Sequence, residues 1–384
     1  MNPVSLYINI PFCSSFCDYC DFYSELIPGK LYDESKIDLF LSSVITDIKN
    51  QIEYYNVEEI PTVFIGGGTP SLLGKRISVL FDALKTIKGF SPDEFTVEAN
   101  PASLTNEFLD ACREGGVNRL SLGIQTFYEP SRFAVNRSGT VETLDESLRQ
   151  ALIYFGESLS VDMMTGLPYQ TEKIIQEDIA HLLKYKPAHI SLYSLIIEND
   201  TPLEEKLNLK KIILPDNETA DAMWFTGCEA LKNAGYEHYE VSNFAFSGKK
   251  CLHNIRYWKM ESWLGAGPAA SGTIINEKDA KGIRYTYPSN LNDYLGSFSG
   301  FSVNKRPWLN FCDNLSKKEL IKETLLMGYR ISEGPDKNKF RKRFNLELDD
   351  CIPKTLKRWR NKDTMLFLNN FLSEAFTELE NIVE

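Results

Sequence analysis

Residues 6–22 read LYINIPFCSSFCDYCDF, and this stretch indicates more about fold and chemistry than any other part of the 384-residue chain. A short apolar run leads directly into Cys13, Cys17 and Cys20, whose spacing is CxxxCxxC. Thiolates this close in sequence converge on one metal centre, and a [4Fe–4S] cluster normally takes four cysteine ligands. With three cysteines one iron keeps an open position, so the stretch predicts a cluster at which a small molecule binds.

Zinc and disulfides are the alternative interpretations of these cysteines. A structural zinc site takes four ligands, commonly in CxxC pairs, and no second pair follows here at a suitable distance. The chain opens with Met1-Asn2-Pro3 and no apolar signal segment, so we expect a reducing, cytoplasmic location in which disulfides are rare. The remaining cysteines are isolated and are expected to be buried thiols: Cys112, Cys228, Cys251, Cys312 and Cys351.

Composition and charge limit the class of protein. Hydrophobic residues make up 43% and charged residues 25% of the chain, as in soluble globular proteins. No apolar run approaches the ~20 residues that a membrane span needs, and a net charge of −11 without a long basic stretch argues against a nucleic-acid partner. The length predicts one large domain and one smaller domain, which we place at residues 1–246 and 247–384.

Short β-branched runs alternate with amphipathic stretches over the first two thirds of the chain. Strands are predicted at residues 5–10, 62–65, 94–98, 119–124, 159–164 and 189–195. Helices are predicted at residues 33–53, 75–88, 105–113, 143–155, 172–184 and 218–233. Six strand-then-helix units indicate an α/β fold in which parallel strands close into a barrel or partial barrel. An open doubly wound sheet is the alternative, and near residue 247 the alternation ends.

Polar and glycine residues gather where the predicted strands end. Cys13 follows the first strand, Gly-Gly-Gly-Thr-Pro at 66–70 follows the second, and Glu98, Gln125 and Asp162 close the next three. Parallel α/β folds place their active sites at the carboxyl ends of the strands. Glycine lets backbone approach a ligand closely, and the acids and the amide suit an amino group and ribose hydroxyls. Taken singly, each residue is equally well explained as a tight turn or a satisfied polar group.

With these motifs in this order, the chain resembles the radical S-adenosylmethionine (SAM) superfamily, whose cluster motif is CxxxCxxC. More narrowly, it resembles the group that contains oxygen-independent coproporphyrinogen III oxidase and the HemW-type heme chaperones. Gly-Gly-Gly-Thr-Pro, Glu-Ala-Asn-Pro, Leu-Ser-Leu-Gly-Ile-Gln and Asp-x-x-x-Gly-Leu-Pro follow one another as they do in that group. The resemblance implies a partial (βα)6 TIM-like barrel with a smaller, mainly helical C-terminal domain that covers the barrel mouth.

The resemblance also implies a set of ligands. Cys13, Cys17 and Cys20 would ligate the cluster, and SAM would chelate the fourth iron through its amino and carboxylate groups. An electron from the reduced cluster would then cleave SAM to methionine and a 5′-deoxyadenosyl radical. The residues whose motifs match those of the SAM pocket are Tyr7, Tyr19, Gly67, Gly68, Thr69, Glu98, Gln125, Arg137 and Asp162.

Two features separate the members of this group. The oxidase motif continues to CxxxCxxCxC, whereas this chain has Phe22 at the further cysteine, as in the HemW type. The second feature is HNxxYW at residues 253–258, a motif associated with the heme chaperones. His253 is the candidate axial ligand to heme iron, and Tyr257 and Trp258 are candidates to stack on the macrocycle. An aromatic-rich helix start that packs on the barrel is the structural alternative.

The resemblance therefore predicts a heme chaperone that binds the cluster, SAM and heme and hands heme to a client protein, with an electron donor as a further partner. Oxidative decarboxylation of coproporphyrinogen III, or radical SAM chemistry on another substrate, is the alternative. The chain departs from the group where it has Asn9 and Phe16, since the group commonly has a histidine and a basic residue there.

Overall fold

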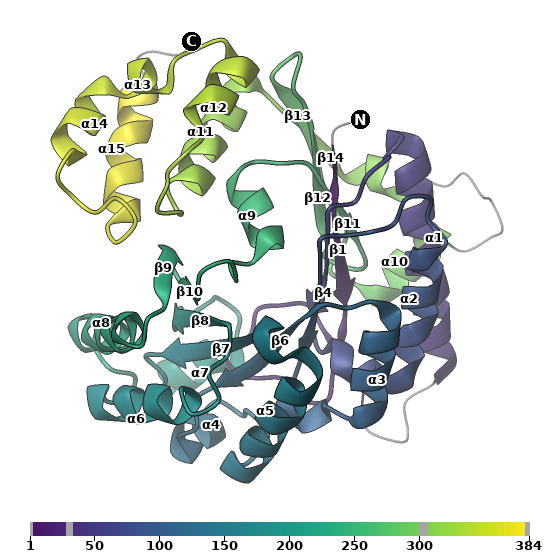
Figure 1. The fold of residues 1–384 in the computed structure, drawn as a ribbon, viewed down its shortest axis with the longest axis vertical. Coiled ribbons are helices and arrows are strands. Elements are labelled where there is room, and N and C mark those ends of the chain that lie inside the picture. Colours follow the sequence, from purple (N-terminus) through teal and green to yellow (C-terminus); the bar gives the residue numbers. More distant parts are fainter. Residues whose placement is uncertain (1–2, 28–33, 299–305, 381–384) are drawn as a thin grey trace.

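The computed structural model of the protein describes residues 3–27, 34–298 and 306–380 (Figure 1). At its centre six parallel strands lie side by side in chain order. They are β1 (Ser5–Ile10), β4 (Thr62–Gly67), β5 (Glu94–Ala99), β6 (Arg119–Gln125), β7 (Leu159–Thr165) and β8 (His189–Ser194). A doubly wound sheet reverses its strand order at a switch point, so the unbroken order confirms the predicted partial barrel and excludes the alternative.

Helices connect these strands and surround the barrel on its outer side (Figure 1). They are α1 (Glu34–Tyr55), α2 (Ile77–Lys85), α3 (Asn106–Gly115), α5 (Val141–Phe155), α6 (Glu172–Leu182) and α8 (Asn217–Asn233). Thr105, Thr140, Thr171 and Asp216 each accept a hydrogen bond from the backbone N–H three residues further on. Such N-caps satisfy donors that a first helical turn leaves free, which is why the predicted and observed starts nearly coincide. The predicted start of the first helix at Asp33 lies outside the described residues.

The central strands have one apolar and one polar face. Side chains alternate between the two faces of a strand, and in β1 the residues Leu6, Ile8 and Ile10 are buried in the core shared with the helices. Tyr7 and Asn9 point the other way, into the barrel, and hydrogen-bond to each other. The barrel lumen is therefore polar. Its lower layer, at the amino ends of the strands, is Ser5, Thr62, Glu94, Arg119, Ser160 and His189.

The sheet continues on both sides of the barrel and reaches twelve strands among the described residues. β9 (Glu237–Glu240) and β10 (Asn243–Ala245) extend the β8 edge in antiparallel fashion. β11 (Trp263–Ala266) pairs parallel with β1, and β12 (Ser271–Asn276), β13 (Lys281–Thr286) and β14 (Cys312–Leu315) continue antiparallel from it. The sequence did not predict these strands. The sheet runs past residue 246, and the division into domains there stays a prediction.

The C-terminal residues form a helical lobe with a hydrophobic cluster of its own (Figure 1). Its helices are α11 (Lys317–Gly328), α12 (Lys337–Phe344), α13 (Leu348–Cys351), α14 (Pro353–Trp359) and α15 (Leu368–Glu380). α10 (Leu291–Phe298) packs on α1 instead. The smaller, mainly helical C-terminal part of the predicted fold is confirmed. Among the described residues, no helix combines the length and the apolarity needed to cross a bilayer.

Candidate cofactor site at the mouth of the barrel

A cavity of about 450 Å³ opens at the carboxyl ends of the barrel strands. Cys13, Cys17 and Cys20 line it, and none of the three forms a disulfide. Eight of the nine predicted SAM-pocket residues line the same cavity: Tyr19, Gly67, Gly68, Thr69, Glu98, Gln125, Arg137 and Asp162. The fold thus gathers into one place residues from six different strand ends and loops of the sequence.

Cys13 ends the short strand β2 (Phe12–Cys13), and Cys17 and Cys20 lie on the loop between β2 and its partner strand β3 (Glu25–Leu26). Cys13 Sγ is 3.6 Å from Thr69 Oγ1, and the Arg137 guanidinium donates to Cys17 Sγ at 3.4 Å. Burial raises the pKa of the Cys20 thiol to about 11, so iron must displace its proton on binding. Within the described part of the chain, no three His, Cys, Asp or Glu side chains form a single-ion site.

The cysteine loop is fixed by two neighbouring elements, α7 (Pro202–Asn208) and the residues after α4 (Glu129–Ala134). The buried Asp18 carboxylate accepts a hydrogen bond from Lys206, and Lys206 also donates to the Ala134 carbonyl at 3.2 Å. The backbone of Asp18 donates to the Val135 carbonyl at 3.0 Å and accepts from Leu203 at 2.8 Å. The loop is therefore ordered by long-range contacts on both sides of Asp18.

The glycine run allows close packing, and its amides are used inside the protein. A Cβ on Gly68 would lie 2.6 Å from the Phe12 carbonyl oxygen, and Gly67 has φ +101°, a conformation that side chains rarely adopt. The Gly67 N–H donates to Glu98 Oε2 at 3.2 Å, and the Gly68 N–H donates to the Ile10 carbonyl at 2.8 Å. Both amides therefore have internal acceptors in this structure, and both glycines border the cavity.

Two half-buried acids, Glu98 and Asp162, line the cavity. Burial, together with the charge of Asp162, raises the pKa of Glu98 to about 8, and the Gly67 N–H opposes the rise. Burial also raises the pKa of Asp162, while hydrogen bonds from Ser191 and Ser121 lower it. A cationic ligand favours the ionised form of such a partly protonated acid, so binding of the ligand should lower the raised pKa.

Arg137 brings a positive charge between the acids and the cysteines. Its guanidinium donates to the Gly123 carbonyl at 2.7 Å and to Cys17 Sγ, while its buried Nε has no hydrogen-bond partner. A buried N–H without a partner is costly, so this group is oriented for an acceptor that a ligand supplies. The carboxylate of an amino acid is such an acceptor. Gln125, with φ +69°, completes this side of the cavity.

One predicted pocket residue lies elsewhere, and several lining residues were missed. Tyr7 does not border the cavity: its hydroxyl donates to Asn9 Oδ1 at 3.2 Å and its ring stacks on Phe64. Tyr193 and Ser121 do border the cavity. The alternation of faces along β8 and β6 was the signal that could have found both, since they lie on the same face as Asp162 and Glu98.

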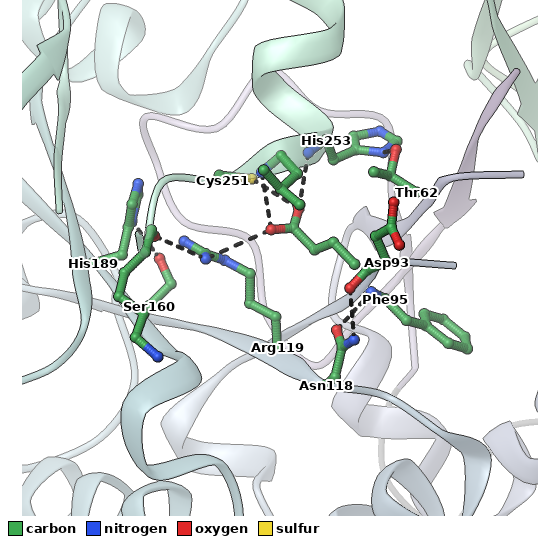
Figure 2. Close-up of polar contacts among 12 residues, drawn as sticks. Thr62, Asp93, Phe95, Asn118, Arg119, Ser160, His189, Cys251 and His253 are labelled. Atoms are coloured by element: carbon green, nitrogen blue, oxygen red, sulfur yellow. Dashed lines mark hydrogen bonds and ion pairs between the residues drawn. The ribbon is translucent and has the colours of Figure 1, made fainter. Parts of the chain in front are cut away.

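The candidate heme residues lie at the opposite end of the barrel. His253 and Tyr257 belong to α9 (Leu252–Trp258), which packs on β4 and α11. His253 is 0% exposed, and its Nδ1 is 2.9 Å from the Thr62 hydroxyl (Figure 2). Its Nε2 is 2.8 Å from the Tyr257 hydroxyl. Burial, with Arg256 nearby, lowers the pKa of His253 to about 3. Both ring nitrogens are occupied, so His253 does not fit an axial ligand here, and Trp258 is buried too.

Glu94 at the start of β5 holds α9 in this place. Its carboxylate accepts hydrogen bonds from the backbone N–H groups of Leu252 and His253, both at 2.9 Å. It also faces Arg119 at 3.6 Å and Cys251 Sγ at 3.4 Å. A carboxylate at a helix N-terminus satisfies donors of the first turn and complements the helix dipole. The motif is thus a helix start that closes the barrel floor, the structural alternative named above.

The fold and the site together define a class of protein. It is a six-stranded parallel partial barrel with three free cysteines, two acids and an arginine at its mouth. The family model described as the radical SAM superfamily matches residues 7–182. The solved structure of the coproporphyrinogen III oxidase HemN from Escherichia coli has a TM-score of 0.80 at 20% identity and covers 97% of this chain and 90% of its own. At that identity the likeness shows a shared fold.

Two curated relatives narrow the class. The heme chaperone HemW of Lactococcus lactis is 33% identical over 349 residues, which is 90% of this chain and 86% of that protein. The heme chaperone HemW of Bacillus subtilis is 32% identical over 92% of this chain and 90% of its own length. The chain belongs to the HemW family of the radical SAM superfamily. This membership confirms the resemblance to the radical SAM superfamily and its HemW-type group. It also confirms the [4Fe–4S] cluster and SAM as the cofactors of this class.

Proposed function

We propose that this protein is a heme chaperone that carries a [4Fe–4S] cluster and SAM and transfers heme to client proteins. The single observation that carries the proposal is the similarity to proteins named heme chaperone HemW along nearly the whole chain. Phe22 supports it, because the oxidase pattern has a further cysteine at that position. An electron donor, a heme-receiving client and a cytoplasmic location are parts of the proposal.

In this proposal Cys13, Cys17 and Cys20 hold the cluster, and the cavity beside them holds SAM. Arg137 would donate a hydrogen bond from its unpartnered Nε to the SAM carboxylate, and Glu98 would pair with a cationic group. Tyr19, Gly67, Gly68, Thr69, Gln125 and Asp162 enclose the remainder of the ligand. When bound, the cluster supplies the electron that cleaves SAM; the protein positions the groups and keeps the lumen closed.

The heme site is proposed without His253. Coordination through this imidazole requires that Thr62 or Tyr257 release a ring nitrogen and that α9 leave the barrel floor, where Glu94 holds it. The other histidines are also engaged: His189 bonds to Ser160 and Tyr239, His181 to Asp145, and His238 to the Val241 carbonyl. Heme ligation by any of them competes with an internal contact.

Heme titration of the anaerobically reconstituted protein tests the function. We expect stoichiometric binding and transfer to an apo-protein; absence of binding refutes the chaperone proposal. His253→Ala should bind heme as tightly as the wild type and melt at a lower temperature, because its imidazole bridges α9 and β4. A variant with normal melting and lost heme binding would instead place heme at α9. His238→Ala, at the β9–β10 hairpin, is the matched control.

A further inference from the structure

Arg132 in α4 is a buried arginine whose guanidinium binds backbone carbonyl groups. The residue is 2% exposed. Its Nη1 donates to the carbonyls of Ile124 at 2.7 Å and Thr126 at 3.0 Å; its Nε donates to the Gly139 carbonyl at 3.0 Å, and its Nη2 donates to the Ser138 carbonyl. A planar, five-donor group suits acceptors spread over two segments. The four acceptors fall into two pairs.

The first pair frames Gln125. Ile124 and Thr126 are its neighbours in sequence, and Gln125 itself has φ +69°. The pairing of β6 with β7 shifts register at this point. A non-glycine residue in the left-handed region is strained and persists only where its surroundings fix it. The Arg132 guanidinium holds the carbonyl groups on both sides of this residue, whose side chain borders the cavity.

The second pair directly follows Arg137. Ser138 and Gly139 continue the loop that carries this arginine, and the Arg137 N–H donates to the Arg132 carbonyl at 2.8 Å. The Arg137 side chain then turns back to the Gly123 carbonyl and Cys17 Sγ. The path of this loop therefore decides where the Arg137 guanidinium meets the cavity.

We propose that Arg132 is a positioning residue of the SAM pocket, joining the turn after β6 to the loop after α4 so that Gln125 and Arg137 keep a fixed separation. The inference rests on the SAM pocket of the proposed function. Burial, with the nearby Arg137 charge, lowers the pKa of Arg132 only to about 10, so the group stays charged at neutral pH. Lysine presents its donors from one point and cannot reach both segments.

Arg132→Lys tests this role, with Arg343→Lys as the matched control. Arg343 is equally buried, at 4% exposure, and donates to Glu277 and the Met260 carbonyl in the C-terminal lobe, away from the cavity. Both variants remove a buried guanidinium network, so both should lower the melting temperature. Only Arg132→Lys should weaken SAM binding. The expected loss of affinity is about tenfold or more, which corresponds to the loss of one charge-assisted hydrogen bond in the pocket.

Three measurements on the reconstituted holoprotein decide the outcome: iron per chain, SAM affinity by equilibrium binding, and amide exchange of residues 124–127 and 137–140 without SAM. We expect unchanged iron, weaker SAM binding and faster exchange confined to these two segments in Arg132→Lys. Wild-type SAM affinity or unchanged exchange in this variant would overturn the positioning role. If the wild type itself binds no SAM, the pocket assignment fails, and this inference fails with it.

Discussion

SAM affinity should rise with pH, because the carboxyl group proposed to pair with SAM is protonated in the empty pocket. Burial and the charge of Asp162 raise the pKa of Glu98 to about 8. A cationic ligand favours the ionised carboxylate, so binding at lower pH requires that the protein first release a proton. The expected direction is weaker binding as pH falls below 8.

The magnitude follows from the ionised fraction of Glu98. With a pKa near 8 the carboxylate is about half ionised at pH 8 and about 1% ionised at pH 6, which predicts about a 50-fold loss of affinity over that interval. Glu98→Gln keeps the size of the side chain but removes the titration. Its SAM affinity should be low and nearly independent of pH.

Equilibrium binding of SAM to the anaerobically reconstituted protein at pH 6, 7 and 8 is the assay, with iron content measured in every sample. Asp162, Tyr193 and Arg137 line the same cavity as Glu98, and the charge of Asp162 is a cause of the raised pKa of Glu98. Asp162→Asn should therefore move the transition to lower pH. A flat wild-type profile, or the same slope in Glu98→Gln, would refute the assignment of Glu98 to the SAM cation.

Three further outcomes are expected. Cys17→Ala should lose iron on reconstitution whereas Cys312→Ala should keep it, and equal iron in both would contradict the ligand assignment. Burial raises the pKa of Asp47 to about 7 against hydrogen bonds that lower it. The folded protein then holds a proton that the unfolded chain releases, so the free energy of unfolding should decrease as the pH rises from 4 to 7. Asp47→Asn should flatten this slope in thermal melts. Glu94→Ala should destabilise the protein by about 3–5 kcal/mol, because it leaves the Arg119 charge buried without its partner; denaturant unfolding that differs from wild type by less than 1 kcal/mol would show that the pair is dispensable.

Much of the barrel was predictable because its signals are local. Apolar runs define the strands, and N-caps such as Thr140 and Thr171 define the helix starts. In each case the residues that give the signal lie within a few positions of each other in the sequence. The strands β9, β10, β11 and β14 gave no comparable signal, since each is only three or four residues long, and β11 forms by pairing with the distant strand β1. Local periodicity contains no information about such a partner.

The candidate site was also predictable only in part. The spacing of Cys13, Cys17 and Cys20 and the positions of Glu98 and Asp162 at strand ends were decided by the sequence, because parallel strands bring their carboxyl ends to one edge whatever the packing details. Tyr7 and Tyr193 show the limit of that argument. Both lie on lumen-facing positions, yet only Tyr193 reaches the cavity, because Asn9 and Phe64 enclose the Tyr7 side chain.

The sequence by itself determined the family, the parallel barrel and the cysteine site, since each is specified by residue type and spacing along one stretch of chain. Only the tertiary structure decided the place of His253. Its motif is equally compatible with an exposed heme ligand and a buried helix start. The choice is made by Glu94 and Thr62, more than 150 positions away, which bind the start of α9 and the imidazole in the interior of the protein. Contacts over such a separation exist only once the chain has folded.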